Sequence, residues 1–503
     1  MIAPVLEAAW DGWWLVFAWP NILYPLVGTL AAMVFALLPG LTGATLMAIA
    51  IPLTFHWDPL PTMLVFGALV GGSTFMGSVT SILFNIPGRT SNVATMFDGH
   101  PLAREGQART AIGCAAAASA LGSTFGVAIL VLLIPFMRET LLSFGPAEFL
   151  MLSIWGLTTL AILSTGSMVK GLGGAAFGLM LSFAGHDPRT AELRFTFSSD
   201  YLQDGLALVP AFLGLFALTE VIDLMRSRRQ TIADPRSNTA LGGSVWHGVL
   251  AVFQNFGLFI RSSIIGTVVG IIPGIGASVA SFVAYGHAAQ WHGRGGKAFG
   301  TGNIRGVIAP EAANDAKDGG SLVPTLMFGI PGGTGTAMLL GMLTVHGLNP
   351  GREMLEENLS LAFVLIWSLF LSNWLTSLLG VATVSPLARL TSVRTQLLLP
   401  VILMLALGGA YVYRGRISDV VLACLFGLLG YAMKKHGWPR VPMVIALVLG
   451  PLFEQSFHLT LRLQELGRID FWARPIVLGL LIFTVCSLLV PVYQGLRARN
   501  RPR

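Results

Sequence analysis

Proline–glycine pairs interrupt the apolar sequence of this 503-residue chain at four points. They lie in LLPGLTGA, SILFNIPG, IIPGIGA and TLMFGIPG, as Pro39 and Gly40, Pro87 and Gly88, Pro273 and Gly274, and Pro331 and Gly332. Proline removes a backbone donor and clashes with the preceding helical turn, whereas glycine lets the chain leave the helix at low steric cost. Each pair is therefore expected to end one half-helix and begin another. The free amide hydrogens and partial positive charge of a half-helix N-terminus can bind an anion without a buried lysine or arginine.

The interruptions recur in the same order in the two halves of the chain. Pro39 and Pro273 are 234 positions apart, and Pro87 and Pro331 are 244 apart. A single Pro-Gly pair is more often a plain kink between packed helices. Paired breaks in corresponding positions of two halves, in contrast, indicate a transporter substrate site near the bilayer midplane.

Acidic residues cluster between the two breaks of the second half, in EAANDAKD. Glu311, Asn314, Asp315 and Asp318 are spaced i, i+3, i+4, i+7, so that in a helix they share one face. Such a face suits a cation or a proton. The alternative is a solvated loop with local salt bridges to Lys317, since the Gly-Gly pair that follows could end a helix at the interface.

The elements that must position these residues are membrane helices. The chain is 54% hydrophobic and only 11% charged, against about 25% charged for an average soluble domain. Uncharged apolar windows such as 111–137 and 475–493 are long enough to cross a bilayer. We expect an all-α polytopic membrane protein with about 12 transmembrane helices, in two repeats that we expect to be inverted. The 59 glycines and 27 prolines predict that several helices are broken or re-entrant.

Arginine clusters divide the chain. Four arginines lie between 226 and 236, and four more among the last seven residues, and basic segments favour the cytoplasmic side of a membrane. We expect residues 1–225 to form the first transmembrane repeat, 226–243 a basic cytoplasmic linker, 244–496 the second repeat and 497–503 a basic cytoplasmic tail. The excess of 31 Lys and Arg over 24 Asp and Glu is attributed to topology and not to nucleic acid binding.

Motifs for enzymatic chemistry are missing from the sequence. It contains no H-E-x-x-H, phosphate-binding loop or nucleophile elbow. Cys114, Cys424 and Cys486 are far apart in apolar surroundings, which fits neither a disulfide framework nor a metal cluster. We therefore expect neither an enzyme nor a cofactor.

Five long motifs resemble a known family. They are LLPGLTGATLMAIAIPLTFHWDPLP, GSTFMGSVTSILFNIPG, ATMFDGHPLAREGQA, RSSIIGTVVGIIPGIGASVASF and APEAANDAKDGGSLVPTLMFGIPG. Together they resemble the large membrane subunit of the tripartite tricarboxylate transporters, the TctA family, over roughly residues 26–450. The resemblance implies a secondary transporter of the bacterial inner membrane that imports an organic carboxylate with a Na⁺ or H⁺ gradient. Its implied partners are a TctB-like small membrane subunit and a TctC-like periplasmic solute-binding protein. A carboxylate channel or uniporter without ion coupling is the alternative.

The resemblance also implies a substrate region beside the breaks. In the first half it falls on Gly77, Ser78, Ser81, Asn85, Pro87 and Gly88, and in the second on Glu311, Asn314, Gly319, Gly320, Pro331 and Gly332. Hydroxyl and amide groups can donate to a carboxylate without a permanent charge. Glu311 and Asp315 are the candidates for ion coupling.

Arg89 departs from the family pattern, which usually has a neutral or acidic residue after the first IPG. Its guanidinium could pair bidentately with a substrate carboxylate, or it could reach out to phospholipid at a helix end. Asp98 and His100, in DGHP, are typical of a turn.

Overall fold

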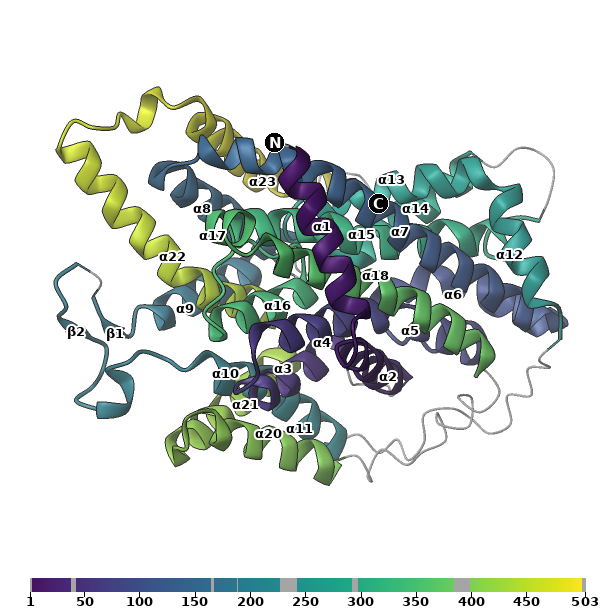
Figure 1. Cartoon of the computed structure of the whole chain (residues 1–503), viewed down its shortest axis with the longest axis horizontal. Helices are drawn as coiled ribbons and strands as arrows, with labels where there is room; N and C mark the ends of the chain where they lie inside the picture. Colours follow the sequence, from purple (N-terminus) through teal and green to yellow (C-terminus); the bar gives the residue numbers. More distant parts are fainter. Residues whose placement is uncertain are drawn as a thin grey trace.

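Helices form nearly all of the regular structure in the computed structural model of this chain (Figure 1). The structure describes residues 2–37, 42–163, 167–187, 189–226, 242–291, 297–383 and 399–499. Pro39 and Gly40, most of the expected 226–243 linker and the last four residues of the expected 497–503 tail lie outside these residues. The predictions made for them are therefore untested.

The described part of the first half contains short and long helices and one small hairpin. The elements are α1 (Ile2–Phe17), α2 (Leu23–Leu37), α3 (Gly43–Thr54), α4 (Pro59–Gly72), α5 (Thr74–Phe84), the 3-10 turn η1 (Thr90–Asn92), α6 (Val93–Leu102), the π-turn η2 (Ala103–Gln107), α7 (Ala108–Leu142), α8 (Pro146–Leu163), α9 (Met168–Ser182), η3 (Asp200–Leu202), α10 (Leu208–Phe212), the π-turn η4 (Leu213–Leu218) and α11 (Thr219–Arg226). Strands β1 (Gly185–His186) and β2 (Leu193–Arg194) pair antiparallel.

The described part of the second half is helical throughout. Its elements are α12 (Val245–Gln254), α13 (Phe256–Ile271), α14 (Gly276–Gln290), α15 (Arg305–Phe328), α16 (Thr334–Val345), α17 (Arg352–Glu356), α18 (Leu359–Ala382), α20 (Leu399–Arg414), α21 (Ile417–Lys435), α22 (Arg440–Glu465), η6 (Phe471–Ala473) and α23 (Pro475–Arg499).

Six helical stretches in the described residues are long and apolar enough to cross a membrane. They are Pro59–Phe84, Thr90–Leu141, Leu208–Arg226, Leu359–Ala382, Ile417–Lys435 and Arg440–Glu465. A seventh span would be the pair α12 and α13, which bends by 81°. Shorter apolar helices, among them α3, α9, α16 and α20, complete the set. The expected all-α membrane architecture with broken helices is confirmed at this level.

Helix α15 lies at the centre, between α7 and α13 (Figure 1). All of its residues from Gly306 to Met327 are buried except Lys317. A Cβ placed on Gly122 or Gly126 of α7 would come within 2.5 or 2.3 Å of an α15 carbonyl oxygen, and one on Gly266 or Gly270 of α13 within 2.2 or 2.4 Å. Small residues spaced in this way let helix backbones approach closely in a membrane protein. Both neighbours of α15 therefore contact it backbone to backbone.

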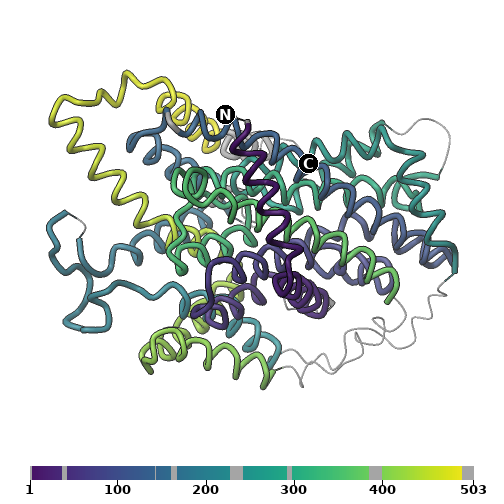
Figure 2. Tube along the Cα trace, in the orientation of Figure 1, coloured from purple at the N-terminus to yellow at the C-terminus, as the bar shows by residue number. Residues whose placement is uncertain are grey.

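Helix α4 makes the reciprocal contact, with α18 of the second half. Hydroxyls on successive turns of α18 donate to α4 carbonyl oxygens: Ser368 to Leu64, Ser372 to Ala68 at 2.8 Å and Thr376 to Gly72 at 3.3 Å. The first-half helix α7 packs on the second-half helix α15, and the second-half helix α18 packs on the first-half helix α4. Figure 2 shows the resulting interleaving, with purple and blue segments running beside teal and green ones.

Candidate functional site

The first break begins at Asn85, which caps the end of α5. Asn85 has left-handed backbone angles, φ 56° and ψ 31°, and Pro87 and Gly88 follow. The Gly88 amide donates to the Gly77 carbonyl at 3.4 Å, and a Cβ on Gly88 would lie 2.4 Å from Gly77 Cα. The chain therefore folds back onto α5 through two glycines, a contact that side chains would block.

The second break repeats this geometry 244 residues later. Helix α15 ends at Gly329, again left-handed, with φ 68° and ψ 22°. A Cβ on Gly332 would lie 2.5 Å from Ser321 Cβ, and residues 332 and 321 are the counterparts of 88 and 77. Helix α16 then begins at Thr334.

Side-chain hydrogen bonds follow the same register. The Ser81 hydroxyl donates to the Gly77 carbonyl at 2.9 Å. Its counterpart Thr325 donates to the Ser321 carbonyl at 2.7 Å. In both halves a hydroxyl thus caps the helical turn against which the IPG loop packs.

Both breaks approach the N-terminal end of α14. Thr90, just after the first break, shares a hydrogen bond of 2.7 Å with Ser278 of α14. At the second break, a Cβ on Gly333 would lie 3.9 Å from Gly276 Cα. Gly274 and Gly276 have φ of 84° and 74°, so the Pro273–Gly274 pair also interrupts the chain here. Three of the four predicted interruptions therefore lie close together.

Arg89 lies at the edge of this region, against the first turn of α3. Its Nη1 donates to the Thr74 hydroxyl at 3.2 Å, and its Nη2 lies 3.5 Å from where a Cβ on Gly43 would be. Among the described residues, no carboxylate lies within 4.0 Å of its guanidinium nitrogens. Gly43 opens α3, whose N-cap Thr42 accepts from the Thr45 amide at 3.2 Å. A guanidinium without an acidic partner beside a helix N-terminus suits a bound anion.

Glu311 of α15 is fully buried and reaches across to the first half. The Ser78 hydroxyl lies 2.7 Å from its Oε1 and 2.8 Å from its Oε2, and the Thr95 hydroxyl also bonds Oε1. Asn92 Nδ2 donates to Ser78 Oγ at 2.7 Å. Ser78, which was predicted to bind substrate, is therefore hydrogen-bonded to Glu311, which was predicted to couple transport to an ion.

Other polar groups of α15 have incomplete hydrogen bonding. Asp315 accepts at Oδ2 from Ser119 of α7, but its Oδ1 and both amide atoms of Asn314 have no hydrogen-bond partner in the described part of the chain. Asp318 pairs with Lys317. Buried polar atoms are rarely left without partners in folded proteins, so these atoms fit a wet or ion-binding position.

Of the two interpretations of EAANDAKD, the structure contains the helical one. Gly319 and Gly320 do not end the helix, because they serve close packing: a Cβ on either would lie within 2.3 Å of the backbone of α7 or α13. Segment 311–318 is accordingly a buried helix and not a solvated loop.

The DGHP motif is part of helix α6 and not a turn. Asp98 accepts from the amides of Gly300, Gly302 and Asn303 at 2.8–2.9 Å and from the Tyr285 hydroxyl at 2.9 Å. Its carboxylate thus bonds distant segments in place of its own backbone, which removes the local reason for a turn.

Three residues of this cluster were not predicted: Asn92, Thr95 and Ser119. Each is a small polar residue in an apolar stretch, and each bonds a partner more than a dozen positions away. Their residue types indicate only weakly that they belong to a site. Their partners depend on how the two halves of the chain pack together.

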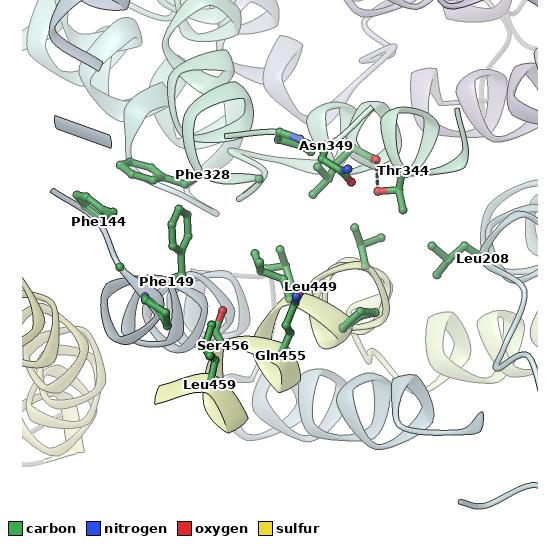
Figure 3. A pocket seen from close by; sticks show the side chains of 18 residues that line it. Phe144, Phe149, Leu208, Phe328, Thr344, Asn349, Leu449, Gln455, Ser456 and Leu459 are labelled. Atoms are coloured by element: carbon green, nitrogen blue, oxygen red, sulfur yellow. Dashed lines mark hydrogen bonds between the residues drawn. The ribbon is translucent and has the colours of Figure 1, made fainter. Parts of the chain in front are cut away.

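A cavity of about 560 Å³ lies beside the second break (Figure 3). Phe144, Phe149 and Phe328 line one side, while Leu449 and Gln455 of α22 line another. Gly329 also belongs to its wall. The end of α15 therefore borders a cavity whose lining is mostly apolar.

Comparison of the chain with known protein families matches it to the family that its five motifs resemble. Residues 22–445 match the family described as the tripartite tricarboxylate transporter TctA family. An uncharacterized 52.8 kDa protein from the TAR-I ttuC' 3' region of Agrobacterium vitis is 28% identical over 480 residues, which is 95% of either chain. An uncharacterized protein from the TAR-II ttuC' 3' region of the same organism is 27% identical over 235 residues, covering 47% of this chain and 97% of that relative.

No solved structure matches the chain. The family match covers well over half of the sequence, and it includes both IPG breaks and the whole of α15. The chain belongs to the TctA family, a family of transporters and not of enzymes.

Proposed function

We propose that this large membrane subunit imports an organic carboxylate of the tricarboxylate class across the bacterial inner membrane, driven by a Na⁺ or H⁺ gradient. The observation that carries the proposal is Arg89, which lies without an acidic partner where the first break meets the start of α3. An anionic substrate is the partner that this arrangement lacks. The family supports the same substrate class.

The substrate site consists of groups from both breaks. We assign to it Gly77, Ser78, Ser81, Asn85, Pro87, Gly88 and Arg89 from the first half and Asn314, Pro331 and Gly332 from the second. The break at Pro273–Gly274 supplies a further helix end, and we expect the same of Pro39–Gly40, which lies outside the described residues. Amides and one guanidinium bind a carboxylate strongly, yet they allow its release when the helix ends move apart.

Coupling resides on Glu311 and Asp315, which lie one helical turn apart on α15. Transport proceeds by alternating access, with two inverted repeats, residues 1–225 and 244–496, moving around the shared site. The reciprocal packing of α15 on α7 and of α4 on α18 supports such a repeat. A basic cytoplasmic linker at 226–243 and the tail at 497–503 place both ends of the second repeat on the cytoplasmic side.

Family membership implies a tripartite system with TctB and TctC partners. In it, a periplasmic solute-binding protein delivers the carboxylate, and the small membrane subunit accompanies the large one. Neither partner needs to form the anion site, because its groups all come from this chain.

Uptake of labelled acids tests the proposal. The chain, with its small subunit and binding protein, is reconstituted in proteoliposomes and offered citrate-like, dicarboxylic and aromatic acids under an imposed Na⁺ or pH gradient. We expect uphill accumulation of at least one multivalent carboxylate. Downhill flux that ignores both gradients would instead establish the alternative, an uncoupled channel or uniporter.

A further inference from the structure

We propose that Glu311 carries the coupling ion as a proton, and that the structure shows its protonated form with Ser78 accepting the acidic hydrogen. The role in transport rests on the proposed function above. The protonation itself rests on the hydrogen-bond geometry around this side chain and on its burial away from any cation.

The geometry around Ser78 fits a protonated carboxyl group. Ser78 Oγ makes three short contacts, to Asn92 Nδ2, Glu311 Oε1 and Glu311 Oε2, all between 2.7 and 2.8 Å. Asn92 supplies the hydrogen of the first contact, and the Ser78 hydroxyl supplies one hydrogen to Glu311. A carboxylate shares that one hydrogen between Oε1 and Oε2, whereas a carboxylic acid fills the second contact with its own hydrogen and forms a cyclic pair with the hydroxyl.

A consistent assignment follows. Glu311 Oε2 carries the proton and donates to Ser78 Oγ, while Ser78 and Thr95 both donate to Oε1. Ser78 then donates once and accepts twice, which fills the capacity of a hydroxyl group. Every short contact in the cluster contains one hydrogen.

The surroundings favour a neutral carboxyl as well. Glu311 is fully buried, and no Lys, Arg or His nitrogen of the described residues lies within 4.0 Å of it. An unpaired buried carboxylate is strongly destabilising, so such a group takes up a proton or binds a cation.

None of the charged groups in the described residues of the elements packed around α15 forms an ion pair with Glu311. Asp315 and Cys114 interact electrostatically with Glu311 from α15 and α7, and neither supplies a positive charge. Several have partners elsewhere: Lys317 with Asp318, Asp98 of α6 with Tyr285 of α14, His100 of α6 with the Ile82 carbonyl, and Arg261 of α13 and His287 of α14 with the Trp291 ring. Arg109, Arg138 and Glu139 of α7 and Arg305 of α15 form no ion pair with Glu311.

The proton is linked to the first break by the residues that hold it. Ser78 lies on α5 before the break, and Asn92 lies on η1 after it, three residues beyond Arg89. Asn92 also packs against Gly77, where a Cβ would come within 2.3 Å of its Oδ1. Loss of the proton removes the hydrogen that Glu311 donates to Ser78, so Ser78 Oγ then accepts from Asn92 alone. The protonation of Glu311 is thereby linked to the turn that follows Arg89.

Infrared difference spectroscopy of the full chain in lipid, recorded through a pH titration without substrate, tests the protonation. We expect a carbonyl band of a protonated carboxylic acid that disappears in Glu311→Gln and persists in Asp318→Asn, whose carboxylate is paired with Lys317. Ser78→Ala should keep the band but shift its frequency, because the acidic hydrogen loses its acceptor.

Two results would overturn the proposal: a band that is unchanged in Glu311→Gln, or a Glu311 band that Na⁺ removes at constant pH. Misfolding of Glu311→Gln would also remove the band. Ser78→Ala resolves this, because it leaves Glu311 in place and should shift the frequency of the band. The titration contains no substrate, so its result does not depend on transport. Failure of carboxylate uptake would contradict the proposed function without contradicting the protonation of Glu311.

Discussion

At the scale of single residues, Arg89 and Glu311 have opposite surroundings. Arg89 has hydroxyl and backbone neighbours and no acid beside it, so its charge is available to an anion. Glu311 has hydroxyl neighbours and no base beside it, so its charge is available to a cation or is neutralised by a proton. Arg89 is the N-cap of η1, and Glu311 is linked through Ser78 to Asn92 at the end of the same turn.

Replacing Arg89 tests the anion site. A hydrogen bond to a charged group contributes about 1.5–3 kcal/mol, so Arg89→Gln should weaken carboxylate binding about 10- to 100-fold. Arg89→Lys should lose less, because it keeps the charge and loses only the bidentate geometry. Equilibrium binding of labelled substrate measures the effect, with Arg352→Gln, from an exposed pair with Glu356, as control. Unchanged affinity in Arg89→Gln would assign Arg89 to the lipid headgroups.

The sequence predicted the residue types of this site better than their partners. Both IPG breaks, Arg89 and the helical face of Glu311 and Asp315 follow from local spacing. That Ser78 and Thr95 bond Glu311 depends on contacts over more than 200 positions, and no local pattern encodes them. Gly319 and Gly320 left the helix and loop interpretations open for a related reason, since glycine serves both helix ends and close packing.

At the scale of elements, glycine determines how closely α15 is held. Helix α7 presents Gly122 and Gly126 to it, and α13 presents Gly266 and Gly270. Because α15 carries the ion-coupling candidates and ends at the second break, we expect its distance from both neighbours to affect both proposed ligand sites. Helix α4 is held differently, by the hydroxyls of α18.

Adding a single methyl group to this contact tests its role. Gly126→Ala places a Cβ 2.3 Å from the Ala316 carbonyl, and overpacking of this kind typically costs about 1–3 kcal/mol. We expect a lower unfolding temperature in thermal scans of the purified protein. Gly286→Ala on α14 is the matched control, because nothing lies within 4 Å of its Cβ position. Equal stability of the two variants would show that α7 and α15 are farther apart than described.

At the scale of the whole molecule, each half supplies the packing partner of the other half's broken segment. The two IPG loops have the same backbone turn 244 residues apart. The cavity beside Gly329 gives the second loop space next to α22. This arrangement fits two repeats that move against each other, and the cavity offers room for that movement.

Labelling from the two sides of the membrane tests whether the repeats are inverted. Thr90→Cys and Thr334→Cys mark the residues just after the two breaks, in a background where the exposed Cys424 and Cys486 are replaced by serine. An impermeant thiol reagent should reach the two positions preferentially from opposite sides, and substrate should change both rates. Access to both positions from one side only, in every condition, would contradict inversion.

Gradient-driven accumulation in proteoliposomes tests the central claim that carboxylate and proton bind to groups on either side of one break. Proteoliposomes that contain the transporter are loaded with unlabelled carboxylate to measure exchange, and a pH gradient is then imposed across their membrane to measure accumulation. We expect the wild type to do both, and Glu311→Gln to exchange substrate but no longer accumulate it when the pH gradient is applied. Accumulation by Glu311→Gln at the wild-type level, or accumulation by the wild type with a Na⁺ gradient alone, would contradict the account.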